Sequence, residues 1–412
     1  MYLSALYNYS LKYLKKYNYI DLFSGVGGIS LGLKMAGFEN VFSNEYDKEI
    51  ALSYSKNFPE HKMINEDINA LDFEGLKSSF GLNDHSVDLI VGGPPCQGFS
   101  MANRKRIDED PRNLLFTKFH KAVRIIKPKC FLIENVMGMS SETVNLSSKE
   151  FVLSENLAEY FKQIGYSIKF TSFKSEEHGV PQIRRRIMIV GTRLENKRLA
   201  LDQNKIGNLQ KKFLSKDKLI KKDDGQIELF ANIEHNTLKK PVTVWQAISD
   251  LPSLEKKLEC SEYLSNPSND YQRYLRKDSD GLFNHKKTPH SQEAIERIML
   301  IKQGENFTSL PENLKTKSVH SGAYGRLEAA GLSPTITTRF DTPSTGRVIH
   351  PFEHRCLTVR EAARIQSFPD SFVFHGSRTS QGKQVGNAVP PLVAKEIGEM
   401  FKKDFLDGPR GI

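Results

Sequence analysis

The chain has 412 residues, of which 38% are hydrophobic, 26% charged and 10% aromatic. This composition is that of a globular protein, and it excludes collagen-like, disordered and disulfide-scaffold proteins. The length suffices for roughly two or three domains, and the formal net charge of +10 favours a polyanionic partner.

Residues 1–18 are expected to form an N-terminal arm. They contain five tyrosines and three lysines, and they lack the apolar core and cleavage site of a secretion signal. No apolar run in the sequence approaches the roughly 20 residues of a membrane span. We therefore expect a cytoplasmic protein that does not associate with membranes.

Residues 19–192 alternate short apolar runs with longer amphipathic stretches, which is typical of βα units in a mostly parallel sheet. Helices are predicted over residues 114–126 and before Gly165, where apolar residues recur at helical spacing. The predicted fold class is therefore α/β, with a doubly wound, mostly parallel sheet. Its strands are predicted at residues 19–23, 40–43, 86–92, 130–134, 168–173 and 187–191.

The first predicted strand leads into a glycine-rich turn at residues 21–28. In this fold class, such a turn brings backbone N–H groups close to a ligand. The dinucleotide fingerprint needs a further glycine where the chain has Ser30, so a nicotinamide cofactor is disfavoured. The turn favours a nucleoside ligand without a pyrophosphate, whose ribose hydroxyls Glu45 can bind. A purely structural turn is the alternative.

Cys96 lies in a glycine- and proline-rich loop, at residues 92–100, which follows another predicted strand. Ligands of open α/β sheets bind at the carboxyl ends of strands, and two prolines fix the backbone before this thiol. Attack on an unreactive aromatic carbon needs a strong nucleophile, and a thiolate is the best available. Cys96 is therefore a candidate nucleophile, with a small buried hydrophobic role as the alternative. The spacing of Cys96, Cys130, Cys260 and Cys356 predicts neither a metal site nor a disulfide framework.

Beyond residue 193 the alternation fades, and a second, smaller domain is expected over residues 193–332. Residues 192–330 carry 24 basic and 19 acidic side chains, about twice the positive charge per residue of the rest. A solvated lysine-rich face is the alternative to a nucleic-acid contact. Residues 333–412 are expected to return to the first domain and to end in an amphipathic helix over residues 391–405.

Eight motifs resemble, in order, those of the DNA (cytosine-5) methyltransferase family in its bacterial modification type. The resemblance implies a Rossmann-like fold, S-adenosylmethionine as methyl donor, no metal, and cytosine in double-stranded DNA as substrate. It also places a target-recognition domain in residues 193–332. The motifs occupy residues 21–28, 44–47, 67–68, 92–100, 134–136, 182–186, 355–369 and 384–391.

The resemblance implies nine contacts with S-adenosylmethionine. The residue types suit a nucleoside, because Glu45 can accept from both ribose hydroxyls and Asp67 can accept from the adenine amine. The ring of Tyr46 can pack on adenine. The nine residues are Phe23, Gly25, Gly28, Glu45, Tyr46, Asp67, Ile68, Leu115 and Asn387.

The resemblance also implies a catalytic set of Cys96, Glu134, Arg184 and Arg186. Cys96 attacks C6 of cytosine, so that C5 can take the methyl group and then lose its proton. Glu134 must be protonated, because it donates to N3 of the ring. Arg186 holds the cytosine carbonyl, and Arg184 and Gln182 support it.

The target atoms are out of reach in a stacked duplex, so the resemblance implies that the base is flipped out. The polar segment 100–112 resembles the mobile loop that closes over DNA and contacts phosphates. The residues expected to contact DNA are Ser100, Arg104, Lys105, Arg106 and Gln182.

The leading hypothesis is a monomeric, sequence-specific modification enzyme that pairs with a restriction endonuclease. One alternative is a tRNA cytosine-5 methyltransferase, which the long middle region disfavours. A catalytically inactive DNA-binding relative is another alternative. The presence of Cys96, Glu134, Arg184 and Arg186 disfavours it.

Overall fold

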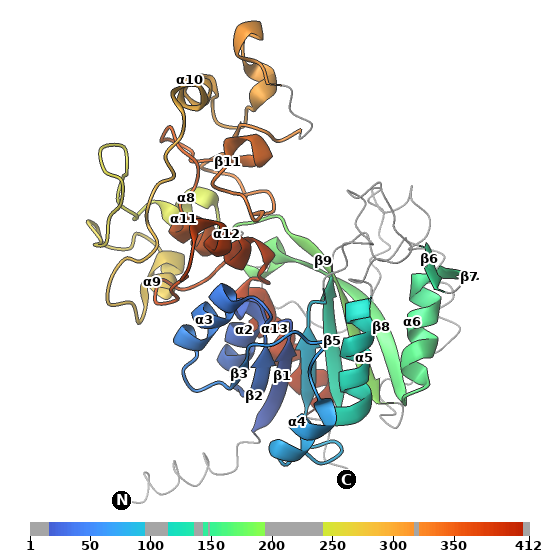
Figure 1. Cartoon of the computed structure of the whole chain (residues 1–412). Coiled ribbons are helices and arrows are strands. Elements are labelled where there is room, and N and C mark those ends of the chain that lie inside the picture. The colour runs from blue at the N-terminus through green and yellow to red at the C-terminus, as the bar shows by residue number, and fades with distance from the viewer. Residues whose placement is uncertain are drawn as a thin grey trace, which may run out of the picture.

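The computed structural model describes residues 16–94, 114–135, 143–146, 149–193, 242–316 and 321–406. It contains a sheet flanked by helices and a more irregular region, which lies above the sheet in Figure 1. Within these ranges, no helix combines the length and apolar character that crossing a membrane would require.

A seven-stranded sheet forms the first region, in the order β3-β2-β1-β4-β5-β9-β8 (Figure 1). The first five of these strands run parallel, whereas β9 is antiparallel to both β5 and β8. The chain order reverses between β1 and β4, which is where doubly wound folds bind ligands. The strands are β1 (Tyr17–Leu22), β2 (Phe38–Asn44), β3 (Met63–Ile64), β4 (Leu89–Gly92), β5 (Cys130–Asn135), β8 (Tyr166–Lys174) and β9 (Arg185–Arg193).

The predicted fold class is confirmed, and all six predicted strands are present with ends that shift by a few residues. The strand expected over residues 86–92 begins only at Leu89. The short β3 was not predicted, because two residues cannot show an alternation.

Helices cover both faces of this sheet, because successive side chains of a strand point to opposite faces. In β1, Tyr19 belongs to a core with α2 and α13, whereas Ile20 and Leu22 belong to a core with α4, α5 and α6. The helices are α2 (Gly28–Met35), α4 (Phe73–Ser79), α5 (Leu114–Ile126), α6 (Leu153–Lys162) and α13 (Pro391–Phe401).

The C-terminal helix α13 returns to the sheet and packs directly on α2. A Cβ added at Gly32 would lie 2.3 Å from Ala394 Cβ, so only glycine permits this approach. The helix expected to continue to residue 405 changes type after Phe401, where a π-helical turn begins.

Short elements joined by irregular segments form the second region around two apolar cores. The larger core contains Val244, Phe340 and Leu357, and it extends to Ile50 and Tyr54 of α3. The smaller core contains Ala323, Ile298 of α10 and Ile349 of β11. The elements are α3 (Lys48–Asn57), α8 (Val244–Ile248), α9 (Asp270–Arg276), α10 (Gln292–Leu300), β10 (Gly325–Arg326), β11 (Arg347–Ile349), α11 (Val359–Ile365) and α12 (Arg378–Asn387). The remaining short elements are β6 (Thr143–Leu146), β7 (Lys149–Val152), η4 (Ser175–His178), η6 (Phe307–Ser309), η7 (Glu312–Leu314), η8 (Pro343–Thr345) and η9 (Lys402–Leu406).

A buried ionic cluster ties this region together. Arg364 is fully buried and pairs with Asp250 and Asp370, so that two acids from distant parts of the chain share one guanidinium. Residues 336–374 thus pack with residues 244–275, whereas α13 packs on the sheet. The expected boundary at residue 332 stays a prediction.

Candidate active site

The glycine-rich turn lies at the carboxyl end of β1, next to the end of β2. Phe23, Gly25 and Gly27 all have positive φ angles, and Gly27 is the N-cap of α2. The amide of Gly25 donates to Glu45 Oε2 at 2.9 Å. A Cβ added at Gly25 would meet no atom of the described part of the chain within 4 Å, so these residues leave the turn open.

Glu45 lies where its carboxylate can serve both the turn and a ligand. Its Oε1 accepts from the amide of Asp47 at 2.8 Å. Burial raises the pKa of Glu45, while the hydrogen bonds from the amides of Asp47 and Gly25 lower it. Next to it, the ring of Tyr46 is 72% exposed and is therefore free to pack on a flat ligand.

Two asparagines hold the adjoining loops beside Glu45. Asn65 donates to the carbonyl oxygens of Glu45 and Tyr46, and Asn44 donates to those of Ile64 and Glu66. Asn44 lies in a predicted motif, but nothing in the sequence marked Asn65, because its role depends on where the chain folds back.

The other predicted cofactor residues lie on neighbouring elements. Asp67 is exposed and accepts from the amide of Asn69, while Ile68 is buried in the core. Phe23 and Leu115 pack at the edge of that same core. Asp67 and the exposed Tyr46 bring the polar and aromatic groups of a nucleoside site to this end of the sheet.

Asp21 lies beneath the turn and is completely buried. Ser30 donates to its Oδ2 at 2.7 Å, whereas its Oδ1 has no hydrogen-bond partner among the described residues. Burial raises the pKa of Asp21 to about 7, the bond from Ser30 opposes the shift, and the charge of Glu45 adds to it. The residue that breaks the dinucleotide fingerprint therefore supports the acid at the start of the turn.

Glu134 and Arg186 meet across the antiparallel strands β5 and β9. Arg186 Nε lies 3.0 Å from Glu134 Oε1, and both side chains are mostly buried. The loop that carries Cys96 begins beside them, because a Cβ added at Gly93 would lie 3.4 Å from Glu134 Oε2. The side chain of Asn135 also donates to the carbonyl of Pro94 at 3.2 Å. The remaining predicted residues of this loop lie outside the described residues: Cys96, Ser100, Arg104, Lys105 and Arg106.

Gln182 and Arg184 precede Arg186 in the sequence. Both are buried, and their side chains contact residues of the C-terminal part of the chain. Arg184 donates to the carbonyl oxygens of Gly386 at 3.0 Å and of Asn387 at 3.5 Å. Burial lowers the pKa of Arg184 to about 9, the charge of Arg186 lowers it further, and Glu134 opposes the shift. Asn387, predicted to contact the cofactor, is thus joined to Arg184 through its backbone.

Gly28 shows how closely the C-terminal segment approaches the turn. A Cβ added there would lie 2.2 Å from the carbonyl oxygen of Val389, two residues after Asn387. The structure therefore brings the two ends of the predicted cofactor site, Gly28 and residues 387–389, into direct contact.

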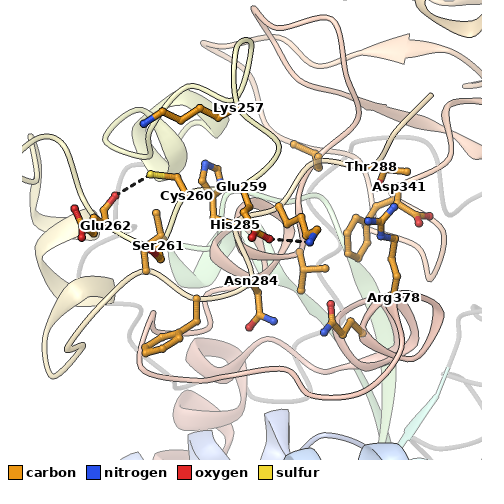
Figure 2. A pocket seen from close by; sticks show the side chains of 18 of the residues that line it. Lys257, Glu259, Cys260, Ser261, Glu262, Asn284, His285, Thr288, Asp341 and Arg378 are labelled. Atoms are coloured by element: carbon orange, nitrogen blue, oxygen red, sulfur yellow. Dashed lines mark hydrogen bonds and ion pairs between the residues drawn. The ribbon is translucent and has the colours of Figure 1, made fainter. Parts of the chain in front are cut away.

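A separate cavity of about 580 Å³ lies in the second region, beside the start of α12 (Figure 2). Its lining includes Arg378 and Asp341, and Lys286 pairs with Glu259 at 2.8 Å. Because charges of both signs line it, this cavity shows no preference for a polyanion.

Comparison with known proteins agrees with this geometry. Residues 17–403 match the model of the C-5 cytosine-specific DNA methylase family. The chain is 35% identical to the type II methyltransferase M.DdeI of Desulfomicrobium norvegicum, over 94% of this chain and 89% of that protein. It is 33% identical to the type II methyltransferase M1.HphI of Haemophilus parahaemolyticus, over 95% of this chain and 88% of that protein.

A solved structure is similar over almost the whole fold. It is a putative DNA modification methyltransferase encoded within an E. coli prophage, with a TM-score of 0.70 and 28% identity. The alignment covers 95% of this chain and 99% of that one. As its eight motifs predict, the chain belongs to the C-5 cytosine-specific DNA methylase family and is an S-adenosylmethionine-dependent DNA (cytosine-5) methyltransferase.

Proposed function

We propose that the chain methylates C5 of one cytosine within a short defined sequence of double-stranded DNA, with Cys96 as the nucleophile. The observation that carries this proposal is the pair of Glu134 and Arg186 at the root of the loop that contains Cys96. An acid at the carboxyl end of β5 and a cation beside it, at the start of β9, suit a ring that gains negative charge during attack.

The other cysteines support the choice of Cys96. Burial raises the pKa of Cys130 to about 12, and it also raises the pKa of Cys356. Neither thiol can supply a thiolate near neutral pH. Cys260 lies in the second region, where its Sγ donates to the carbonyl of Glu262.

In the proposed reaction, Cys96 Sγ forms a bond to C6 of cytosine while Glu134 donates a proton to N3. The electron pair then available at C5 takes up the methyl group, and S-adenosylhomocysteine is left. A base from solvent takes the C5 proton, Cys96 departs as thiolate, and N3 returns its proton to Glu134, which restores the aromatic ring. Arg186 donates to the cytosine carbonyl. When Arg186 moves from Glu134 to that carbonyl oxygen, the Glu134 carboxylate can take up the proton that it later donates to N3.

S-adenosylmethionine, when bound, supplies the methyl group. We place its ribose at Glu45 and its adenine between Tyr46, Asp67 and Ile68. The open turn at Gly25 and the exposed ring of Tyr46 fit this assignment. The other proposed contacts are Phe23, Gly28, Leu115 and Asn387.

We assign the reading of DNA to residues 193–332, whose excess of positive charge suits phosphate contacts. Flipping the cytosine out of the duplex costs a few kcal/mol of lost base stacking. Residues 100–112 would close over the DNA around the flipped base. Similarity to type II methyltransferases supports pairing with a restriction endonuclease. We also propose that the enzyme acts as a monomer. Its DNA substrate places it in the bacterial cytoplasm.

The test of this function offers the purified chain a labelled methyl donor with either double-stranded DNA or tRNA. We expect label at C5 of cytosine in DNA only, at one recurrent sequence that bisulfite sequencing of DNA from expressing cells also reports. Labelling of tRNA in place of DNA would contradict the proposed substrate.

A further inference from the structure

The side chains of Gln182 and Gln366 form a buried pair that joins two distant parts of the chain. Both residues are 0% exposed, and Gln182 Nε2 donates to Gln366 Oε1 at 2.8 Å. Gln182 Oε1 accepts from the amide of Ile336 at 2.7 Å. Gln366 Nε2 donates to the carbonyl of Val385 at 2.8 Å. The polar atoms of each amide are thus engaged, and removing one would leave buried partners without hydrogen bonds.

Arg184, two residues after Gln182, contacts the same two segments, which contain Ile336 and residues 385–386. It donates to the carbonyl of Ile336 at 3.4 Å and to that of Gly386 at 3.0 Å. Its backbone is fixed as well, because Ser175 Oγ donates to the carbonyl of Gln182 and accepts from the amide of Arg184. A guanidinium buried among carbonyls at 3% exposure is sensitive to any shift of those carbonyls.

The segments held by these side chains are packed in direct contact with each other. A Cβ added at Gly386 would lie 2.5 Å from the carbonyl carbon of Thr337. Three residues after Gly386, the carbonyl of Val389 touches Gly28 at the glycine-rich turn. Two residues after Arg184, in the other direction, comes Arg186 with its partner Glu134. The buried hydrogen bonds therefore lie between the proposed cofactor turn and the proposed cytosine-holding arginine.

We propose that Gln182, Arg184 and Gln366 are positioning residues that set the distance between bound S-adenosylmethionine and the cytosine held by Arg186. This inference rests on the proposed function, and it adds Gln366, which lies in the motif at residues 355–369 but has no role assigned above. None of the three needs to touch cytosine or the methyl donor. Their effect passes through the backbones of Arg186 and of residues 385–389.

The test replaces Gln366 by leucine, an apolar side chain of similar bulk that removes the hydrogen bonds to Gln182, Val385 and Ala388. We expect kcat to fall at least tenfold and KM for S-adenosylmethionine to rise at least fivefold, because both reacting partners lose their alignment. Binding of S-adenosylhomocysteine, measured by calorimetry, should weaken by a similar factor. A role in stability alone would lower the melting temperature and leave kcat and KM unchanged.

Asn18→Leu is the matched control. The Asn18 amide donates to the carbonyl of Ser86 and accepts from the amide of Asp88, both at 2.9 Å. It also joins two segments distant in sequence, but it lies at the amino ends of the strands, opposite the site. This variant should have a lower melting temperature than wild type, while its kcat and KM stay within twofold of the wild-type values.

Arg184→Lys keeps the inference testable if Gln366→Leu does not fold. Lysine retains the charge but cannot reach the carbonyls of Ile336, Gly386 and Asn387 together. It should weaken S-adenosylhomocysteine binding at least fivefold. If the wild-type chain methylates no DNA, the proposed function is contradicted. If the wild-type chain is active but the folded variants keep its kcat and KM, only this inference is contradicted.

Discussion

Arg186 Nε and Glu134 Oε1 lie 3.0 Å apart, across the neighbouring antiparallel strands β9 and β5. Because these strands run in opposite directions, one residue near the start of β9 meets one near the end of β5. The cation and the acid thus come from different motifs, 52 positions apart, yet form one charged pair. The first two predictions concern the chemistry around this pair.

A stable protein–DNA adduct should form on DNA that contains 5-fluorocytosine at the target position. Fluorine cannot leave C5 as a proton leaves, so the bond between Cys96 and C6 persists. A denaturing gel should show the adduct for wild type and none for Cys96→Ser. The serine variant should still bind DNA in a mobility-shift assay. An active preparation that yields no adduct would contradict covalent attack by Cys96.

Glu134→Gln should lower kcat by about a hundredfold or more, which is the size expected for loss of a general acid. KM for S-adenosylmethionine should stay within twofold, because Glu134 faces the base rather than the donor. Steady-state kinetics with both substrates varied measures the two effects. Glu177→Gln is the control, since Glu177 forms an exposed pair with Lys174 and should retain full activity. Equal losses in the two variants would count against the proposed acid.

Stability of the unliganded enzyme should fall as pH rises from about 4 to about 7, through Asp21. The ordinary pKa of this carboxyl is 3.8, and burial raises it to about 7 in the folded chain. Between these values the folded state holds more protons than the unfolded state, so raising the pH favours unfolding. Asp21→Asn removes the penalty and should be more stable by a few kcal/mol at pH 8, with little difference near pH 4. Thermal unfolding at both pH values measures the difference. If the stability gained by Asp21→Asn over wild type does not increase with pH, the raised pKa of Asp21 is refuted.

Arg364→Met should destabilise the fold by about 3–5 kcal/mol, because it leaves Asp250 and Asp370 buried without their shared cation. Chemical denaturation gives the free energy of unfolding. Arg273→Met is the comparison, since Arg273 pairs with Asp270 at the surface and its loss should cost about 1 kcal/mol or less. Similar losses in both variants would mean that the buried cluster contributes no more than a surface pair.

The sheet could be predicted because its strands carry a pattern that depends only on local sequence. Tyr19 and Ile20 face different cores, and both are apolar, which marks a strand covered on both sides. The two-residue β3 carries no such pattern. The end of the last helix could not be predicted either, because its apolar spacing continues through the π-helical turn that follows Phe401.

The site was predictable only as far as motifs name residues. The resemblance gave Arg186 to the cytosine and Arg184 a supporting role, but the motif at residues 182–186 could not show that Arg184 is buried against backbone carbonyls. That burial arises from Thr337 and Gly386, which lie far away in sequence and pack against each other. Gln366 and Asn65 were missed for the same reason, since their partners are backbone atoms that only the fold brings near.

The contact between Gly32 and Ala394 has a consequence for biosynthesis. The helix that begins at the cofactor turn is covered by a helix that the ribosome makes some 360 residues later. During translation, α2 therefore remains without this cover until the ribosome has made residues 391–401. The nascent chain can complete the proposed donor site only after that point.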